Sequence, residues 1–212
     1  LTGSLEAIKI FSDFDLESAD QDGDTRGFTL QPAVTYGSEP NLYMADEDWV
    51  YSGQKYLRIS QLSGLQDNQT WSKVSCTGCA KGDGFVQVID YSFPLDAAQL
   101  GGQDSTDNDC GENPPGLKHN ICTGDSRLIN SVFRNNHFWT THAGGFPLGA
   151  PNRASVFWYQ INPTVNPIQL VQNGVIDDSR NVANHDYYYY PSIAVDAQDN
   201  AAIGFTSSSI NG

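Results

Sequence analysis

A strand–turn–strand pattern that recurs along the chain constrains the fold more than any other feature of the sequence. In the clearest copy, residues 190–205, Ile193 and Val195 alternate with small residues, a polar turn follows at 197–200, and an apolar strand returns. Earlier copies cover residues 32–44 and 130–140. Each copy opens a buried strand with a small residue, which is Ala33, Ser131 or Ser192. A hairpin repeated in this way predicts an all-β fold, with a β-propeller as the leading candidate.

Further strand-like segments follow the first two hairpins and complete a four-stranded antiparallel unit in each case. They are residues 55–62 and 70–75 after the first hairpin, and 154–161 and 168–176 after the second, with 85–91 as an additional alternating strand. We therefore expect about three blades in one propeller domain that is itself a fragment of a longer ring. The expected division is 1–27 (end of a preceding blade and acidic loop), 28–93 (blade), 94–126 (disulfide-stapled insertion), 127–186 (blade) and 187–212 (start of a further blade).

The charge balance excludes several classes of partner. The formal net charge is -14 and the pI is near 4.3, whereas nucleic acids and anionic membranes attract basic surfaces. No apolar run approaches the roughly 18 residues that a membrane-spanning helix needs. The composition suits a secreted protein, although acidity that serves only solubility explains the charge equally well.

The four cysteines predict two local disulfides, although four cysteines allow three pairings. We favour Cys76–Cys79 and Cys110–Cys122, because the second spacing does not suit a zinc knuckle and the first does not open a helix as a redox motif does. Disulfides imply an oxidising, extracellular location. Asn68 begins the Asn-Gln-Thr sequon and is a candidate glycosylation site.

An acidic loop near the N-terminus raises the question of calcium, the one cofactor that the sequence suggests. Asp20, Asp22 and Asp24 supply carboxylates at alternate positions beside a glycine, as calcium loops do. Thr25 replaces the expected glycine and Gln31 stands where a closing glutamate would fall. A solvated acidic turn therefore remains the alternative reading.

Aromatic residues suggest a carbohydrate platform with an equally simple structural alternative. Tyr187, Tyr188 and Tyr189 precede the third hairpin and are expected to be partly exposed, with Trp139 as a further candidate ring. Packing between blades is the other explanation for aromatic residues in strands. The four histidines show no spacing typical of zinc ligands, and we interpret them as surface or hairpin residues.

Several segments together resemble a known superfamily. These are 123–130, 138–142, 156–161 and the Tyr-Pro-Ser-Ile-Ala-Val-Asp-Ala-Gln-Asp-Asn element at 190–200. They are similar to sialidase-like β-propeller proteins, in particular to secreted bacterial members without an assigned activity. The resemblance covers roughly residues 28–212 and implies a six- or seven-bladed ring, of which this chain would supply about half.

The resemblance also implies what a catalytic member would carry. Sialidases use an arginine triad, a Tyr/Glu nucleophilic pair and an acid/base Asp, and their blades carry a Ser-x-Asp-x-Gly-x-x-Trp box. This chain has neither that box nor a Phe-Arg-Ile-Pro element, and no Tyr/Glu pair is recognisable. Its candidates to line a binding face are Arg58, Arg127, Arg134 and Arg153.

We therefore expect a non-catalytic extracellular propeller module with a binding or structural role. Its partners would be other protein chains or the rest of its own chain completing the ring, and glycans are a further candidate. The alternatives are a glycan-active, sialidase-like hydrolase whose site is completed by missing chain and a lectin-like carbohydrate binder. No catalytic residue is assigned.

Overall fold

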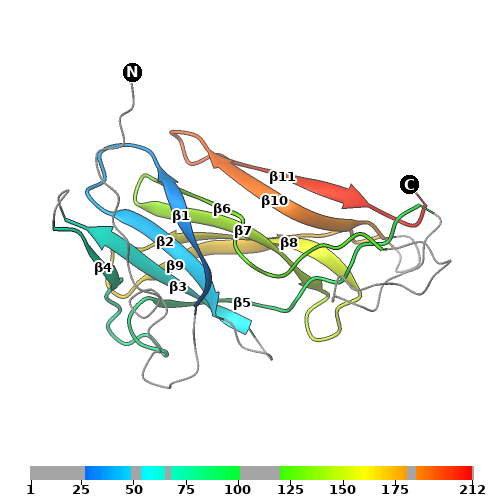
Figure 1. Cartoon of the computed structure of the whole chain (residues 1–212), viewed down its shortest axis with the longest axis horizontal. Helices are drawn as coiled ribbons and strands as arrows, with labels where there is room; N and C mark the ends of the chain where they lie inside the picture. The colour runs from blue at the N-terminus through cyan, green and yellow to red at the C-terminus, as the bar shows by residue number, and fades with distance from the viewer. Residues whose placement is uncertain (1–26, 49–53, 65–67, 101–119, 181–184, 212) are drawn as a thin grey trace.

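Strands and turns make up the described part of the chain, which the computed structural model gives for residues 27–48, 54–64, 68–100, 120–180 and 185–211 (Figure 1). These residues contain no helix, so none that could cross a membrane. The prediction of an all-β fold is confirmed. The strands are β1 (Gly27–Thr35), β2 (Leu42–Asp48), β3 (Gln54–Ser63), β4 (Thr70–Lys73), β5 (Phe85–Tyr91), β6 (Asn130–Arg134), β7 (His137–Phe146), β8 (Arg153–Asn162), β9 (Gln169–Ile176), β10 (Tyr187–Val195) and β11 (Ala201–Ser208).

The strands form two antiparallel meanders and a separate hairpin. We call β1–β5 the first sheet, β6–β9 the second sheet and β10–β11 the third hairpin. The first and second sheets join where β1 and β6 run parallel, giving the strand order β4-β3-β2-β1-β6-β7-β8-β9. In the first sheet β4 and β5 pair with different stretches of the same β3 strand, 60–63 and 54–58. The expected fourth strand (70–75) and the additional strand (85–91) therefore share one partner strand.

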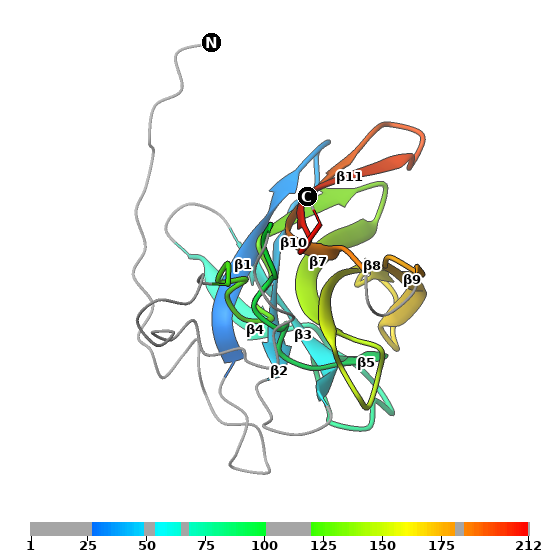
Figure 2. The ribbon, with the colours of Figure 1, turned by 90° about the vertical axis from the view of Figure 1, so that its right-hand side faces the viewer.

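The joined sheet curls so that its two halves face each other, and the third hairpin covers the other side of the second sheet (Figures 1 and 2). Side chains from both halves form one hydrophobic cluster, in which the rings of Tyr43 and Phe133 stack with centroids 4.6 Å apart. A second cluster joins Val132 and Trp139 to Ile193 and Val195 of β10. The central strands β7 and β8 of the second sheet are thus buried on both faces.

Burial on both faces explains why β7 and β8 do not alternate between apolar and charged residues. Nearly every side chain of β7 is buried, and a strand covered on both faces needs small or apolar residues throughout. The packing of side chains against β7 is tight at Gly144, because an added Cβ would lie 2.7 Å from the ring of Phe157. A side chain at this position would force the aromatic core to move.

Two of the three small residues predicted to open the hairpins lie where the units meet. Ala33 of β1 and Ser131 of β6 are direct partners in the parallel register. The third hairpin is attached by side chains, because the amide of Asn130 binds both the N–H and the C=O of Ile193, at 2.9 and 2.8 Å. Ser192, the residue before Ile193, is exposed and pairs with Gly204 of β11, so the third predicted residue does not lie in such a contact.

The disulfide predicted between Cys76 and Cys79 is present, with the two Cα atoms 5.6 Å apart. The loop that this disulfide closes contacts the connection between β8 and β9. There the backbone N–H of Thr77 donates to the side chain of Asn166 at 2.7 Å. Cys122 is also disulfide-bonded. Its expected partner, Cys110, lies outside the described residues.

Candidate functional site

A cluster of polar side chains lies between the first two sheets, where β2 ends. We call it the Glu47 cluster: Glu47 of β2, Tyr159 of β8, and Asp125, Ser126 and Arg127 from the loop before β6. Glu47 points toward the second sheet because side chains alternate along a strand, and Tyr43 and Ala45 of the same strand belong to the shared core. Residues about 80 positions apart in sequence thus meet at one point.

Glu47 carries the strongest electrostatic signal of this cluster. Its side chain is fully buried, one carboxyl oxygen contacts the Ser126 hydroxyl, and the other has no hydrogen-bond partner within the described structure. Burial raises the pKa of Glu47 to about 8, and the nearby Asp125 and Asp46 carboxyl groups act in the same direction. The hydrogen bond from Ser126 and the charge of Arg127 oppose this shift. At neutral pH the side chain is therefore a neutral carboxylic acid.

Asp125 and Arg127 form an ion pair at the margin of the cluster. The guanidinium donates to both carboxylate oxygens, at 2.7 and 2.5 Å, and 47% of the Arg127 side chain remains exposed. Burial alone would raise the pKa of Asp125, but the hydrogen bonds from Arg127 outweigh it and lower the pKa. Asp125 is consequently ionised beside the neutral Glu47.

His142 and Tyr159 extend the cluster into the aromatic core. His142 Nδ1 lies 2.8 Å from the carbonyl oxygen of Ala143, and Nε2 lies 2.9 Å from the Tyr159 hydroxyl. Burial lowers the pKa of His142 to about 4, so the ring is neutral at physiological pH. Because a carbonyl only accepts hydrogen bonds, the proton sits on Nδ1, and the Tyr159 hydroxyl donates to Nε2.

Chemically, the cluster holds two carboxyl groups with displaced pKa values, Glu47 upward and Asp125 downward. Such a pair suits acid–base chemistry when both groups reach a substrate. Here the Glu47 carboxyl is sealed between the sheets, and only Asp125 and Arg127 reach solvent. In this arrangement the described cluster can bind a polar group at its margin and hold a proton inside.

The arginines proposed to line a common face have separate local partners. Arg58 is buried and donates two hydrogen bonds to Asp46, at 3.0 and 2.8 Å, so its expected place on a binding face is wrong. Arg127 pairs with the neighbouring aspartate described above. Arg134 donates to the carbonyl of Val195 at 3.1 Å and lies over a tyrosine ring. These side chains are held by contacts within the fold.

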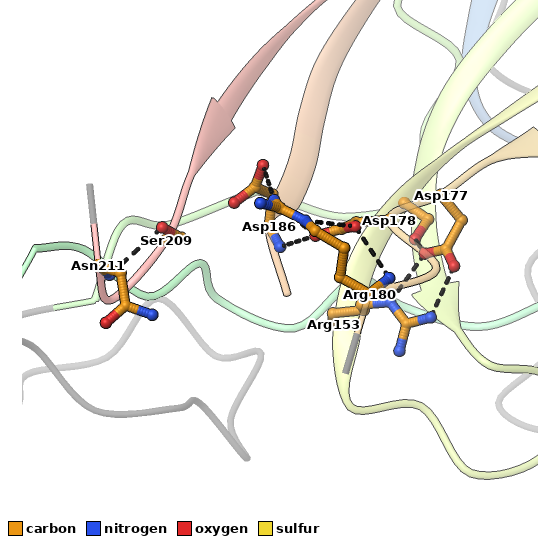
Figure 3. A network of polar contacts seen from close by, with 8 residues as sticks. Arg153, Asp177, Asp178, Arg180, Asp186, Ser209 and Asn211 are labelled. Carbon is orange, nitrogen blue, oxygen red and sulfur yellow. Dashed lines mark hydrogen bonds and ion pairs between the residues drawn. The ribbon is translucent and has the colours of Figure 1, made fainter. Parts of the chain in front are cut away.

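Arg153, the fourth of these arginines, belongs to a network that fastens the connector between β9 and β10 (Figure 3). Its guanidinium binds Asp177 through two hydrogen bonds, at 2.8 and 2.6 Å. In the adjacent network, Arg180 pairs with Asp178 and Asp186, and its hydrogen bonds lower the pKa of Asp178. The network therefore holds the polar connector against the start of β8 and gives it a structural role.

The rings proposed as a carbohydrate platform are largely inside the protein. Tyr187 and Tyr189 are buried, so the expectation that these two rings are partly exposed is wrong, and the further candidate Trp139 is buried as well. The reason is that β10 already begins at Tyr187, and alternation turns Tyr187 and Tyr189 toward the second sheet. Tyr188 faces outward but packs on Phe205, with ring centroids 4.7 Å apart.

The histidines were predicted to be surface or hairpin residues. His142 lies in β7 of the second hairpin but is buried, and His185 is buried outside the strands, which corrects the prediction for His185. His137 is partly exposed and lies 3.2 Å from the Asp199 carboxylate. His119 lies outside the described residues. In the described ranges, no group of three or more His, Cys, Asp or Glu side chains is placed to hold a metal ion.

The candidate calcium loop cannot be compared with this geometry, because Asp20, Asp22 and Asp24 lie outside the described residues. Asn68 is described and exposed, so the sequon begins at the surface. Whether it carries a glycan stays a prediction. Neither feature adds to the Glu47 cluster.

Sequence reasoning named Arg127 as a candidate for a binding face but missed the other members of the Glu47 cluster. The local signal is the run Asp46-Glu-Asp48 at the end of an apolar strand, where carboxyl groups must alternate between the two faces. That alternation predicts that one carboxyl faces the core, but it does not identify Ser126 as its partner.

A scan against protein-family models and searches of curated proteins and of solved structures found no match to this chain.

Proposed function

We propose that this chain is a segment of a β-propeller that acts as a non-catalytic binding or assembly module outside the cell. The observation that carries the proposal is that the first strands of successive hairpins contact each other, β1 with β6 and β6 with β10. Ala33 and Ser131 are paired across β1 and β6, and Asn130 of β6 binds the backbone of Ile193 on β10. Propellers repeat one sheet radially, and small residues permit close approach at such contacts.

Face-to-face packing of successive units supports the same proposal. The second sheet is covered by the first sheet on one face and by the third hairpin on the other. In a propeller each blade packs between its two neighbours in this way. The third hairpin would then be the beginning of a blade.

The disulfide chemistry supports an extracellular setting. Cys76 and Cys79 are bonded to each other, and Cys122 is also bonded. Such bonds persist in oxidising compartments and are rare in the cytosol. The proposed location follows from this chemistry together with the expectation from the sequence.

The environments of the polar residues support a non-catalytic role. Glu47 is sealed from solvent, and Arg58 and Arg153 bind carboxylates of the fold itself. A hydrolase would need such groups to converge on a substrate. In the described part they instead connect strands and sheets.

A glycan-active hydrolase is the second candidate, and one observation favours it. Glu47 and Asp125 have pKa values displaced in opposite directions within one cluster, as an acid and its partner carboxylate do in glycosidases. For this function Glu47 would have to become accessible to a sugar.

Turnover of fluorogenic glycosides, sialosides included, distinguishes the two candidates. We expect no release of fluorophore above the blank from the purified chain. Turnover that is lost in Glu47→Gln and retained in Asp90→Asn, an exposed carboxyl of β5, would overturn the non-catalytic assignment. A glycan array with the same three proteins reports whether sugars bind without turnover.

A further inference from the structure

An open groove lies between the first and second sheets, at the end of the molecule where the turns after β1, β6 and β8 gather (Figure 1). Its volume is about 460 Å³, which is within the range of small-molecule sites. One wall comes from the first sheet, with Glu39, Tyr43 and Gln61, and the other from the β6–β7 turn and from residues 163–166 between β8 and β9. The groove is separate from the Glu47 cluster, which lies at the opposite end of β2.

Contacts within the fold already hold the two walls together. Residues 74–75 of the first wall lead into the loop that the Cys76–Cys79 disulfide closes. The backbone N–H of Ile168, on the other wall, donates to the sulfur of Cys76 at 3.4 Å, in addition to the hydrogen bond between Thr77 and Asn166. A site whose walls are fixed in advance loses less conformational freedom when a ligand binds.

Several polar side chains in the groove retain unused capacity for hydrogen bonds. In the described structure the side chains of Glu39, Ser75 and Asn136 form neither hydrogen bonds nor ion pairs. Ser75 and Asn136 are exposed, and Glu39 is half-buried. A carboxylate, a hydroxyl and an amide together provide both donors and acceptors. The groove can therefore bind a ligand that itself both donates and accepts.

The two asparagines of the β6–β7 turn have different tasks. Both have a positive φ, 50° at Asn135 and 65° at Asn136, so the turn requires the backbone of each. The Asn135 amide binds the β10–β11 turn, where it donates to the Asp199 carboxylate at 2.9 Å. The Asn136 amide instead lines the groove. The fold uses the side chain of Asn135 and leaves that of Asn136 available.

The charge of the groove limits what it can bind. Glu39 is the only charged residue among the described residues that line it. Tyr43 lies beneath Glu39, with its ring stacked on Phe133. Burial raises the pKa of Tyr43, and the charge of Glu39 raises it further, as expected when the carboxylate faces the hydroxyl. The described lining thus contains no cation for an anionic ligand, and one carboxylate is too few for a calcium ion, which takes six to eight oxygens.

We propose that this groove binds a neutral oligosaccharide, with Glu39, Ser75 and Asn136 as its hydrogen-bonding residues. Sugar hydroxyls donate and accept at once, which matches the mixed donors and acceptors of the lining. Val165, of which 40% is exposed, supplies an apolar surface for the C–H face of a sugar ring. A peptide is less suited, because extended peptides bind through a free strand edge, whereas side chains from turns form much of this groove.

This inference rests on the proposed binding role, because it names the class of ligand and the site. The two can fail separately. Turnover of fluorogenic glycosides would overturn the non-catalytic role, whereas binding of neutral sugars without turnover bears on the groove alone.

Saturation-transfer difference NMR with the 212-residue chain tests the proposal. The probes are maltose, cellobiose, lactose and N,N′-diacetylchitobiose, with an anionic methyl sialoside and acetyl-tetraalanine amide as comparison ligands. We expect saturation of at least one of the neutral disaccharides and none of the comparison ligands. Titration of the disaccharide that binds then gives its dissociation constant.

Two variants locate the bound sugar. Asn136→Gly removes the amide and should preserve the turn, because glycine adopts a positive φ without strain. Glu39→Gln removes the charge and keeps the shape of the side chain. Each should raise the dissociation constant about tenfold, as for the loss of one good hydrogen bond. Asp90→Asn, an exposed carboxyl of β5 outside the groove, is the matched control for charge and should leave the affinity unchanged.

Each contrary outcome bears on a different step of the inference. Absence of saturation for all four disaccharides would overturn it, as would equal or stronger saturation of the sialoside or the peptide. If a disaccharide binds the native chain, Glu39→Gln and Asn136→Gly with the same affinity, the sugar occupies another site and the groove is wrongly assigned. Urea unfolding of both variants, expected to match the native chain, separates loss of binding from loss of folding.

Discussion

The two faces of β2 bury neighbouring carboxyl groups in contrasting ways. Asp46 lies on the face away from the second sheet and receives two hydrogen bonds from the Arg58 guanidinium. Glu47 lies on the opposite face, where the Ser126 hydroxyl contacts it and burial raises its pKa to about 8. A buried carboxyl group either finds a cation or keeps its proton. One strand shows both outcomes at adjacent positions.

The contrast teaches that the tolerance of this fold for buried charge depends on the partner. Removing the Arg58 guanidinium takes away two hydrogen bonds and a compensating charge from the buried Asp46 carboxylate. Removing the charge from Glu47 changes little at low pH, where that side chain is already neutral. Each of the following predictions alters one face of β2 while leaving the other intact.

The largest effect is expected for Arg58→Met. Asp46 would remain buried without its guanidinium, and breaking a buried ion pair in this way typically costs about 3–5 kcal/mol in the free energy of unfolding. Urea unfolding at pH 7 measures the loss. The double variant Asp46→Leu/Arg58→Met is the control and should recover most of the stability, because both charges are then absent. A loss below about 1 kcal/mol in the single variant, the value of an exposed pair, would contradict the comparison.

An intermediate effect is expected for Glu47→Gln, and it depends on pH. In the native protein the pKa of Glu47 is about 8, against an ordinary pKa of 4.5 for a glutamate side chain. Below pH 4.5 both folded and unfolded chains hold the proton. As pH rises from 4.5 to 8, only the folded chain holds it, so stability falls by up to about 1.4 kcal/mol per pH unit. Glu47→Gln should remove this slope.

Urea unfolding at pH 5, 6, 7 and 8 gives the required curves. The difference between the native protein and Glu47→Gln isolates Glu47, because His142 contributes equally to both. The lowered pKa of His142, about 4, makes stability fall in the other direction, as pH decreases from 6.5 to 4. Asp90→Asn serves as the matched exposed carboxyl and should retain the native slope. Parallel curves for the native protein and Glu47→Gln would rule out a buried, protonated Glu47.

The smallest effect is expected for Ser126→Ala. The hydrogen bond from Ser126 lowers the pKa of Glu47, so its loss should raise that pKa and extend the falling slope beyond pH 8. The accompanying loss of stability should be about 1 kcal/mol, as for one hydrogen bond. The exposed Ser179→Ala is the control. An unchanged pH profile in Ser126→Ala would show that Ser126 does not set the protonation of Glu47.

Much of the fold could be predicted from local patterns. Alternation located the strands from β1 to β9 and the hairpin turn after Val195, and cysteine spacing predicted the bond between Cys76 and Cys79. The start of β10 was harder to predict from the sequence. Tyr190 has a φ of 48° at a break in register, and the sequence pattern indicated a strand start at this residue. The strand instead begins at Tyr187, which placed two of the tyrosines inside.

The candidate site was not predictable in the same way. The sequence by itself determined that this chain forms short strands whose side chains alternate between two faces, because that period is a local property of the backbone. Only the tertiary structure decided which faces are covered, and therefore that Asp46 meets Arg58 while Glu47 meets Ser126, 79 positions away. The protonation of Glu47 follows from burial between two sheets, and burial depends on the packing of segments that local sequence does not connect.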